Sequence, residues 1–413
     1  MYRIIQEKLN ARNKPLDVIV VGLGFMGFGF VSVSRTYNGL RIPIIITRRP
    51  QEAKKMLEKK GIKTSFSENL SAIRDFAKKG GITISNNLEF IKTYENEIVF
   101  DVTGSVDYGT DVAMKTFEGN KHLVTMNPEL QATVGTELKK IADKKGLIIT
   151  DVVGDQPGSL SRLIGNARMM GFKPLIAGNM KRYMDHHATQ KKMQPWADDK
   201  GLNVRQTVSF TDGTKQSIEM TLVANYFGMK ILQPGMKGPQ IEDFREAIPA
   251  FKNEKIPPEG IVDYVIGKKL FPGVFVICEH TDPNQQKYLR YLNMGDGPRY
   301  VLFDAYHLTH LEAINTIASV AFFKIETINN GLSPTTKTVT IAKSDLKKGQ
   351  SLDGIGGDTA YGQIYGIRES KDYLPVGLSH NAILRRDISQ DTPIKYSDVE
   401  LPINAATRLL GLI

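Results

Sequence analysis

Cysteine is almost absent from this sequence: its 413 residues include one, Cys278. A single cysteine excludes an internal disulfide framework and suits a reducing compartment, so we expect a cytoplasmic protein. Cys278 lies in the apolar run 274–278, which predicts a buried side chain that acts as a small hydrophobe. The sequence also lacks an apolar run of about 18 residues, which excludes a membrane-spanning helix. The first residues form a mixed-charge helical pattern, which is not the pattern of a signal peptide.

Positive charge is in excess, with a formal net charge of +10, but it is not concentrated. The lysines are scattered over expected surface helices, for example at 54–55, 59–60 and 78–79. This pattern indicates a solvated basic surface that attracts anionic ligands, and it disfavours a nucleic-acid interface. The hydrophobic share of 41% and the charged share of 24% are ordinary for a globular protein. The length allows two or three domains, each with its own core.

The strongest pattern is a G-x-G-x-x-G motif at residues 22–27, directly after the β-branched apolar run 18–21. This order predicts a buried parallel strand, a tight turn and the N-terminus of a helix. Gly22 would make the turn, Gly24 would let a pyrophosphate approach the backbone, and Gly27 would let helix and strand pack closely. The motif therefore predicts a dinucleotide site; the alternative is a glycine-rich turn without a ligand.

The first helical turn after this strand would offer the N–H groups of Phe25, Met26 and Gly27, and the positive end of the helix dipole, to the phosphates. At the end of the second expected strand, NAD-specific sites usually carry an acidic residue. This chain has Arg48 and Arg49 there. Two guanidiniums suit a ribose phosphate, so NADP(H) is favoured over NAD(H). The alternative is that both arginines are merely exposed at a helix start, although the helix dipole disfavours cations there.

Beyond the motif, runs that predict strands alternate with runs that predict helices as far as residue 155. This alternation predicts an α/β fold, a doubly wound parallel sheet of the Rossmann type, in a first domain of residues 1–155. The strands of such a sheet present ligand-binding groups where they end. We therefore add Thr103, Gly104 and Asn127, each at the end of an expected strand, to the candidate cofactor site.

The pattern changes after residue 155, which predicts an α+β domain over residues 156–330 for substrate binding and oligomerisation. Within it, residues 308–323 predict an amphipathic helix, which we expect to pack back on the first domain. Residues 329–334 have the composition of a linker. Residues 335–413 then predict a separate, small, β-rich domain.

One part of the second domain carries a hairpin signal. Residues 208–211 predict a strand, and Asp212 with Gly213 predicts the turn of a β-hairpin. The following segment, 216–225, is consistent with either a helix or a strand.

Two lysines are candidates for the chemistry, because an ammonium can polarise a substrate carbonyl and donate a proton as the alkoxide forms. Lys181 follows an expected strand that should end near the cofactor. Lys215 follows the expected hairpin turn, where a solvated lysine is equally ordinary. Glu219 stands in an apolar context, so its carboxylate must be paired or have its pKa raised. It is either catalytic or paired with Lys215, four positions earlier.

Asp155 follows an expected strand, beside glycines. It could orient a lysine, contact the ribose, bind a metal or cap the next helix. His186 and His187 stand beside Asp185, but adjacent side chains point apart and cannot both ligate one ion without distortion. We therefore interpret them as a polar loop and assign no metal-binding residues. His307 is interpreted as a structural histidine.

Residues 121–127 resemble the strand of homoserine dehydrogenases that carries G-K-x-V-V-T-A-N-K, although Pro128 replaces the terminal lysine. The D-P-x-x-D signature of that family and its downstream lysine are absent. Nearly the whole chain more closely resembles the deoxyxylulose phosphate reductoisomerase-like proteins, which are built on a homoserine-dehydrogenase-like scaffold. The matching stretches are 126–127, 154–157, 212–215, 219–220, 224–225, 235–239, 262–264, 266–268, 272–276, 297–298 and 306–309.

The tail resembles a SAF (antifreeze-like) domain at residues 341–349, 374–378 and 386–394. Such domains bind or cover sugar-like ligands in some proteins and are structural modules in others. Residues 178–185 depart from the basic segment of the reductoisomerase-like proteins, and we expect them to face the substrate. The fold and the redox chemistry therefore carry over better than the substrate does.

The resemblance implies an NADP(H)-dependent oxidoreductase acting on a small polyol, sugar or phosphosugar carbonyl. It further implies a reductoisomerase that couples isomerisation to reduction in isoprenoid precursor biosynthesis. Two alternatives are an alcohol dehydrogenase like the homoserine dehydrogenases, and a non-catalytic regulatory protein that binds nucleotides or sugars. We expect a sugar-like or phosphorylated small-molecule partner and a homo-oligomer, with no nucleic acid and no membrane. A requirement for a divalent metal stays open.

Overall fold

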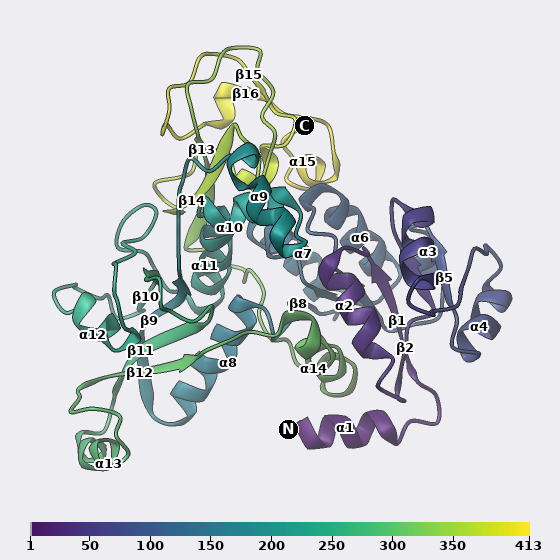
Figure 1. Ribbon diagram of the computed structural model, residues 1–413, viewed down its shortest axis with the longest axis horizontal. Coiled ribbons are helices and arrows are strands. Elements are labelled where there is room, and N and C mark those ends of the chain that lie inside the picture. Colours follow the sequence, from purple (N-terminus) through teal and green to yellow (C-terminus); the bar gives the residue numbers. More distant parts are fainter. Residues whose placement is uncertain (1) are drawn as a thin grey trace. The chain divides into compact units, whose positions relative to one another are not determined.

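The computed structural model describes residues 2–413, with the backbone alone for Tyr2, and the chain divides into two compact units (Figure 1). Unit 1 comprises Met1–Leu130, Glu137–Asp155 and Leu308–Asn329. Unit 2 comprises Gln131–Thr136, Gln156–His307 and Asn330–Ile413. Within residues 2–413, no helix is long and apolar enough to cross a membrane.

Unit 1 is built on a parallel sheet whose strands follow the order β4-β5-β3-β1-β6-β7-β8, with β2 paired to β1 off this path. The strands are β1 (Leu16–Val21), β2 (Leu40–Arg41), β3 (Ile44–Ile46), β4 (Thr64–Ser65), β5 (Ile82–Ser85), β6 (Ile98–Asp101), β7 (His122–Thr125) and β8 (Ile149–Asp151). Strands are added on both sides of β1, with β3, β5 and β4 on one side and β6, β7 and β8 on the other, so the doubly wound parallel sheet predicted from the sequence is confirmed.

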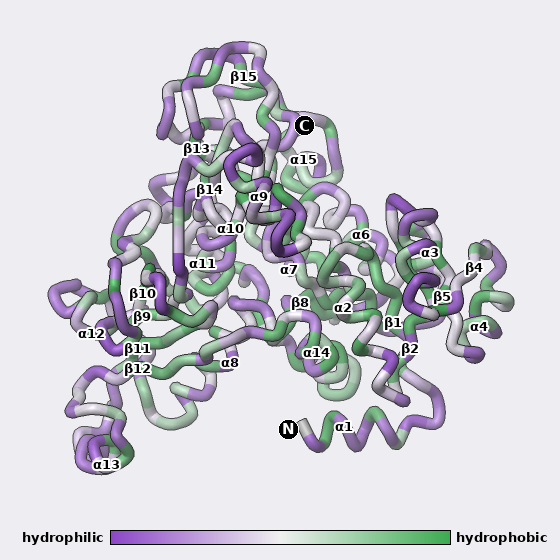
Figure 2. The backbone as a smooth tube through the Cα atoms, viewed as in Figure 1, coloured by the Kyte–Doolittle hydropathy of each residue, from purple (hydrophilic) through white to green (hydrophobic). Residues whose placement is uncertain are grey.

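The central strands β1, β3 and β6 form where the sequence is mainly β-branched and apolar. The last four residues of β1, Val18–Val21, are fully buried, as expected for a strand covered by helices on both faces. The helices are α1 (Tyr2–Asn10), α2 (Phe25–Ser34), α3 (Pro50–Glu58), α4 (Leu70–Lys78), α5 (Phe90–Thr93), α6 (Val106–Glu118), α7 (Pro128–Lys144) and α14 (Thr309–Phe323). The strongly hydrophobic α14 (green in Figure 2) contacts α1 and α2, and its Ile314 and Ile317 join the core that contains Val18 and Phe30.

Unit 2 contains a four-stranded mixed sheet in the order β10-β9-β11-β12. Its strands are β9 (Phe172–Lys181), β10 (Ile261–Ile266), β11 (Val274–His280) and β12 (Arg299–Asp304); β10 runs parallel to β9, and β11 runs antiparallel to both of its neighbours. Helices α8 (Gln156–Met169) and α11 (Thr214–Phe227) pack against this sheet. A core that includes Ile176, Met180, Ile261 and Phe251 fills its other side. The remaining α-helices between β9 and β12 are α9 (Gln190–Lys200), α10 (Val204–Thr211), α12 (Ala247–Ala250) and α13 (Gln286–Tyr291).

The predicted β-hairpin at residues 208–213 is wrong, because this region forms the corner between α10 and α11. Gly213 has a φ of +86° and occupies the N-cap position of α11, and its freedom to adopt positive φ makes the sharp turn. The Asp212 carboxylate accepts a hydrogen bond of 2.9 Å from the Thr214 N–H. An Asp-Gly pair thus joins two helices here instead of two strands, and Lys215 and Glu219 lie on a helix.

The tail also differs from the expectation, since it groups with unit 2 instead of forming a unit of its own. Its elements are β13 (Thr336–Ala342), β14 (Ala360–Gly366), β15 (Ile383–Leu384), β16 (Val399–Glu400) and α15 (Ala405–Leu409). The antiparallel pair β13–β14 packs on α11, where the Gly362 N–H donates to Thr214 Oγ1 at 2.7 Å and the hydroxyls of Thr221 and Thr338 bond at 2.8 Å. Because α11 is buried nearly all round, it needs the tail as cover on the side away from the sheet.

A buried ion pair fastens the tail to the α10–α11 corner. Lys343 Nζ lies 2.8 Å from Asp212 Oδ2, and both side chains are at most 2% exposed. The same ammonium donates to the carbonyl oxygens of Ala188 and Gly357 at 2.8 and 2.6 Å. Two carbonyl acceptors and one carboxylate thus surround the buried ammonium of Lys343, which compensates much of the cost of burying its charge.

We predict that Lys343→Met lowers the free energy of unfolding by about 3–5 kcal/mol, because it leaves the Asp212 carboxylate buried without its cation. Urea denaturation of the full chain measures this. The double variant Lys343→Met with Asp212→Asn is expected to lose less, since it leaves no unpaired charge. A double variant as unstable as the single one would contradict the interpretation.

Candidate functional site

The turn between β1 and α2 has the geometry of a phosphate cradle. Gly22 has a φ of +101°, and a Cβ there would lie 2.9 Å from the carbonyl oxygen of Val102. A Cβ on Gly27 would lie 2.9 Å from the carbonyl oxygen of Gly22. A Cβ on Gly24 would meet nothing within 4 Å. Gly22 and Gly27 are thus required by the close approach of protein segments, whereas Gly24 borders open space.

This open space lies at the N-terminus of α2. The first intrahelical bond runs from the Phe28 N–H to the Gly24 carbonyl at 2.9 Å, so the N–H groups of Phe25, Met26 and Gly27 have no acceptor within the helix. The side chains of Phe25 and Met26 are 60% and 38% exposed. Donors and a positive dipole end meet at this point, which is where a helix binds an anion.

The cradle lies at the switch point of the sheet. From β1 the chain moves outward to β3 and β5 on one side, and it returns to β6 on the other. Ligands of open α/β sheets bind at the carboxyl ends of the strands, where the strand order reverses. The segments that follow β1 and β6, which include Gly22 and Val102, meet at this edge.

The side chains of Asp101 and Asn127 fix the segment after β6 through hydrogen bonds to its backbone. Asp101 is completely buried, and burial raises its pKa. The Thr103 N–H donates to Asp101 Oδ1 at 2.9 Å, and Asn127 Nδ2 donates to Asp101 Oδ2 at 3.1 Å and to the Ser105 carbonyl at 2.9 Å. The Oδ1 of Asn127 caps α7, and the residue is fully buried. Its side chain therefore supports the cradle from inside the protein. Gly104, with a φ of +59°, is exposed.

The two predicted phosphate-reading arginines follow β3 at the same edge of the sheet, and both are exposed. The guanidinium of Arg48 lies 5.2 Å from the ring centre of Tyr108, in the first turn of α6. This cation–π contact gives the side chain a fixed support. Arg49 occupies the N-cap position of α3 and forms an ion pair of 3.1 Å with Glu52, and its side chain is 74% exposed.

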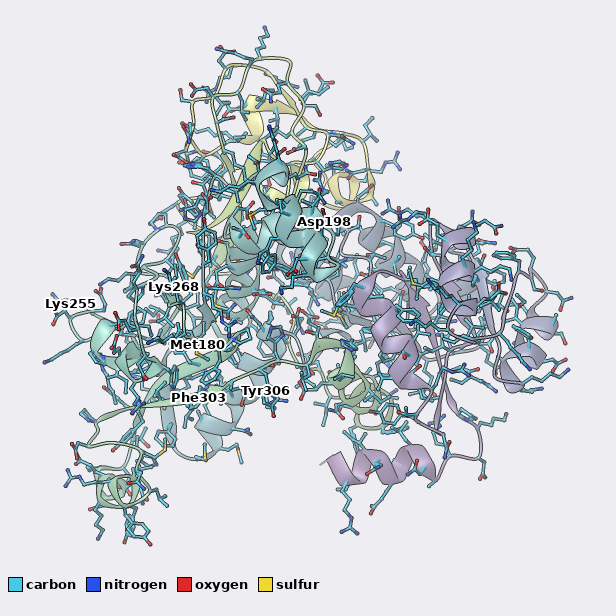
Figure 3. All side chains as sticks on the ribbon, in the orientation of Figure 1. Met180, Asp198, Lys255, Lys268, Phe303 and Tyr306 are labelled. Carbon is cyan, nitrogen blue, oxygen red and sulfur yellow. The ribbon has the colours of Figure 1, made fainter. Side chains whose placement is uncertain are left out.

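Unit 2 contains a buried polar cluster around Lys181, hereafter the Lys181 cluster, which consists of Gln156, Asn179, Lys181, Gln216 and Glu219. Lys181 is the last residue of β9, and Asn179 lies two residues before it, so the two share one face of the strand. Met180, labelled in Figure 3, lies between them and packs in the apolar core on the other face. Gln216 and Glu219, three apart on α11, and Gln156, the first residue of α8, complete the cluster.

The cluster is joined by the amide of Asn179. Asn179 Nδ2 lies 2.9 Å from Glu219 Oε2 and 3.2 Å from Gln216 Oε1, and it also bonds Gln156 Oε1. Lys181 Nζ lies 3.9 Å from Glu219 Oε2, and the two side chains are 15% and 4% exposed. The ammonium of Lys181 is therefore the end of the cluster that lies nearest the surface, with a buried carboxylate behind it.

The remaining candidates take different positions. Lys215 lies in the first turn of α11 and is partly buried. Asp155 is buried and directly precedes α8. His307, outside the candidate set, lies with its Nε2 3.2 Å from Gln156 Nε2 and so borders the Lys181 cluster.

The two adjacent histidines bond separate groups, consistent with a polar loop. His186 Nδ1 lies 2.8 Å from the Asp212 carbonyl oxygen, and its ring stacks on Tyr361. His187 Nε2 lies 2.8 Å from Asp391 Oδ1. In the part of the chain that the structure describes, no group of three or more His, Cys, Asp or Glu side chains could hold a metal ion.

A cavity of about 660 Å³ opens at the carboxyl ends of β9 and β10. One set of its lining side chains is cationic: Arg182, Lys268 (labelled in Figure 3) and Lys269. Glu242 and Glu246 add two carboxylates. Arg182 Nε donates to the Leu270 carbonyl at 2.7 Å, and the Gly267 N–H donates to the Lys181 carbonyl at 2.9 Å. The cavity thus adjoins the backbone of the residue that ends the Lys181 cluster.

Beside this cavity, the buried Asp263 of β10 holds a loop. Its carboxylate accepts hydrogen bonds from the N–H groups of Lys237, Gly238 and Tyr264, at 3.1, 2.9 and 2.8 Å. Burial raises the pKa of Asp263 to about 6, although these donors act in the opposite direction. Gln240, two residues beyond Gly238, is part of the cavity wall.

Sequence reasoning named Lys181 and Glu219 but left Gln156, Asn179 and Gln216 out of the candidate set. Asn179 could have been found from its position two residues before Lys181 in a strand, since such residues share a face. Gln216 and Glu219 share a face only on a helix, and because the sequence left residues 216–225 open between helix and strand, Gln216 was not placed beside Glu219. For Gln156 the sequence gives no signal, because its contact depends on how α8 packs on β9.

The chain matches the family model "Oxidoreductase DRL, catalytic domain" over residues 154–313. The matched region contains Asp155, Lys215 and the whole Lys181 cluster. This match identifies the chain as an oxidoreductase.

Two homoserine dehydrogenases are distant relatives. That of Lactococcus lactis is 21% identical over 228 residues, which cover 52% of this chain and 51% of the relative. That of Neisseria gonorrhoeae is 22% identical over 139 residues, which cover 33% of this chain and 28% of the relative. The chain therefore spans about half the length of the first and less of the second.

Solved structures with a similar course of the chain include biliverdin reductase from Synechocystis in complex with biliverdin and NADP+. It is 14% identical, with a TM-score of 0.38 over 77% of this chain and 94% of that one. DOX-P reductoisomerase in complex with magnesium is 13% identical, with a TM-score of 0.37 over 75% of this chain and 79% of that one.

The carboxyl group of Asp263 gives a pH-dependent prediction. Its pKa in the folded protein, about 6, lies above its ordinary value of 3.8, so the folded state binds a proton that the unfolded state releases between these pH values. By linkage, this group lowers the free energy of unfolding as the pH rises from about 4 to 7, by up to about 3 kcal/mol. Urea titrations of the wild type and Asp263→Asn at several pH values measure the effect. The wild type is expected to lose stability relative to the variant as the pH rises; a difference independent of pH would contradict the interpretation.

Proposed function

We propose that this oxidoreductase uses NADP(H) to reduce the carbonyl group of a small sugar-like or phosphorylated compound. The observation that carries the proposal is the Lys181 ammonium, which is 3.9 Å from the buried carboxylate of Glu219 and is the least buried member of that ion pair. An acid so placed suits proton donation to an oxygen that becomes an alkoxide.

The turn between β1 and α2 supports a nicotinamide dinucleotide as the cofactor. The space in front of Gly24, which a larger side chain would occupy, leaves room for a pyrophosphate beside the first N–H groups of α2. A phosphate on the ribose would be bound by Arg48 and Arg49, since guanidiniums provide several donors in a plane and keep their charge. When bound, the nicotinamide supplies or accepts the hydride.

The chain must then supply the proton and stabilise the charge on the substrate oxygen. The Lys181 ammonium interacts more strongly with a developing alkoxide than with a neutral carbonyl, so it lowers the barrier more than it strengthens substrate binding. Glu219 holds the charge on this lysine, because a carboxylate close by favours the ammonium form. Lys215 and Asp155 stay candidates for a second polar contact.

The cavity beside β9 and β10 supports a phosphorylated substrate. Arg182 and Lys268 offer charges that suit a phosphate, while the carboxylates of Glu242 and Glu246 can accept hydrogen bonds from hydroxyl groups. The resemblance to reductoisomerase-like proteins supports an isomerisation before the reduction. The partial matches to homoserine dehydrogenases favour a second candidate, the oxidation of a small amino alcohol.

The first prediction concerns the cofactor. We expect Arg48→Ala combined with Arg49→Ala to weaken NADPH binding far more than NADH binding, by about 1.5–3 kcal/mol for each charged hydrogen bond that is lost. Calorimetric titration with the two cofactors measures this difference. Arg245→Ala with Arg290→Ala, which removes two exposed arginines from unit 2, controls for net charge. Equal weakening of NADPH and NADH binding would show that Arg48 and Arg49 do not bind the ribose phosphate.

The second prediction concerns turnover. Lys181→Met keeps the length of the side chain and removes its charge, so we expect unchanged NADPH affinity and a turnover number about a hundredfold lower on the substrate that the wild type reduces. Steady-state kinetics, in which NADPH oxidation is followed directly by its absorbance, measure both kcat and KM. Lys173→Met, at an exposed position of the same strand, is the matched control. A variant with raised KM and normal kcat would make Lys181 a ground-state binding residue instead.

A further inference from the structure

The amide of Asn179 has an unusual balance of partners. Its Nδ2 carries two protons but lies within hydrogen-bonding distance of three acceptors: Gln156 Oε1, Gln216 Oε1 and Glu219 Oε2. Its Oδ1 is buried and has no hydrogen-bond partner among residues 2–413. The Asn179 side chain therefore bonds its neighbours through its NH2 group and not through its carbonyl oxygen.

The position of Asn179 connects three elements. The residue is fully buried in β9, and its partners lie at the start of α8 and on successive turns of α11. Because the strand fixes the backbone of Asn179 and Lys181 two residues apart on one face, the amide and the ammonium approach Glu219 from the same strand. One carboxylate oxygen, Glu219 Oε2, is shared by the two side chains at 2.9 and 3.9 Å.

The ionised form of the Glu219 carboxylate depends on hydrogen-bond donors such as the Asn179 amide. A carboxylate that is 4% exposed loses nearly all of its hydration, and it stays ionised only where hydrogen bonds and a cation replace the water. A hydrogen bond from Asn179 stabilises the charged form and also fixes the direction of the carboxylate. An ionised and fixed Glu219 in turn favours the charged form of Lys181.

We propose that Asn179 is a positioning residue that holds the Glu219 carboxylate ionised and directed at Lys181. Its amide acts on the substrate only through that ion pair. The inference rests on the role of Lys181 in the proposed function, but it concerns the protonation of the lysine and can be tested without a substrate.

The test measures the titration of Lys181 in the full-length protein. Acetic anhydride acylates amines only in their neutral form, so labelling at a series of pH values, with peptide mass spectrometry as the readout, gives the midpoint for Lys181. We expect Asn179→Leu, which has a similar shape and no donor, to lower this midpoint by about one pH unit relative to the wild type. Glu219→Gln, which removes the carboxylate itself, is expected to lower it by at least as much.

Two further variants separate positioning from packing. Asn225→Leu removes a different buried asparagine, which lies in α11 and bonds Asn330 and the Thr336 backbone, so it is expected to destabilise the protein and leave the Lys181 midpoint unchanged. If Asn179→Leu does not fold, Asn179→Ser, whose hydroxyl is one atom shorter, is expected to shift the midpoint in the same direction.

The double variant Asn179→Leu with Glu219→Gln decides whether Asn179 acts through Glu219. We expect its midpoint to equal that of Glu219→Gln alone, because the amide then has no carboxylate to hold. A full additional shift in the double variant would overturn the proposal, and so would a wild-type midpoint in Asn179→Leu and Asn179→Ser. Failure of the proposed function would appear differently, as a shifted midpoint in a protein whose turnover does not depend on Lys181.

Discussion

The close approach of two backbone segments, the turn after β1 and the segment after β6, is the constraint on which unit 1 depends. A Cβ on Gly22 would lie 2.9 Å from the Val102 carbonyl oxygen, and a Cβ on Gly27 would lie equally close to Gly22. Any other residue at either position would force β1, β6 and α2 apart. Because this contact fixes the start of α2, the first N–H groups of the helix face open space beside Gly24, where we propose that the cofactor phosphates bind.

Unit 2 depends on a different constraint, the burial of polar groups. Helix α11 is covered on one side by the sheet and on another by the tail, yet it carries threonine, glutamine and glutamate at buried positions. Each such group needs a partner in place of water. The Asp212–Lys343 ion pair meets this need at the α10–α11 corner and the Asn179 amide meets it at Glu219. The polar network that holds the tail and the polar network behind Lys181 therefore share one helix.

The features that depend on residues adjacent in the sequence could be predicted from it. The G-x-G-x-x-G motif after an apolar run predicted β1, the turn and α2, because each step depends on adjacent residues. The parallel sheet followed from the alternation of strand and helix patterns. Lys181 was identified from its position after an expected strand and Glu219 from its charge in apolar surroundings, and the structure brings them together as an ion pair.

Other features could not be predicted from local patterns. Asp212 with Gly213 is a hairpin signal, but positive φ at Gly213 serves a helix corner equally well, and burial of α11 on two sides decides between them. The tail contains several short strands and a linker-like segment before it, which suggested a separate domain; its contacts with α11 come from distant parts of the chain. Gln156 joins Asn179 only through the packing of α8 on β9, which no spacing in the sequence encodes.

We propose above all that the cradle of unit 1 and the Lys181 cluster of unit 2 serve the reduction of a carbonyl compound by NADPH. The most direct test is the loss of NADPH absorbance with a panel of phosphorylated and unphosphorylated ketoses and aldoses, with homoserine and NADP+ tested in the reverse direction. We predict NADPH oxidation with a phosphorylated carbonyl compound and little or no reaction with homoserine. Tight NADPH binding without turnover of any compound in the panel would contradict the claim and would favour a regulatory protein that binds the nucleotide.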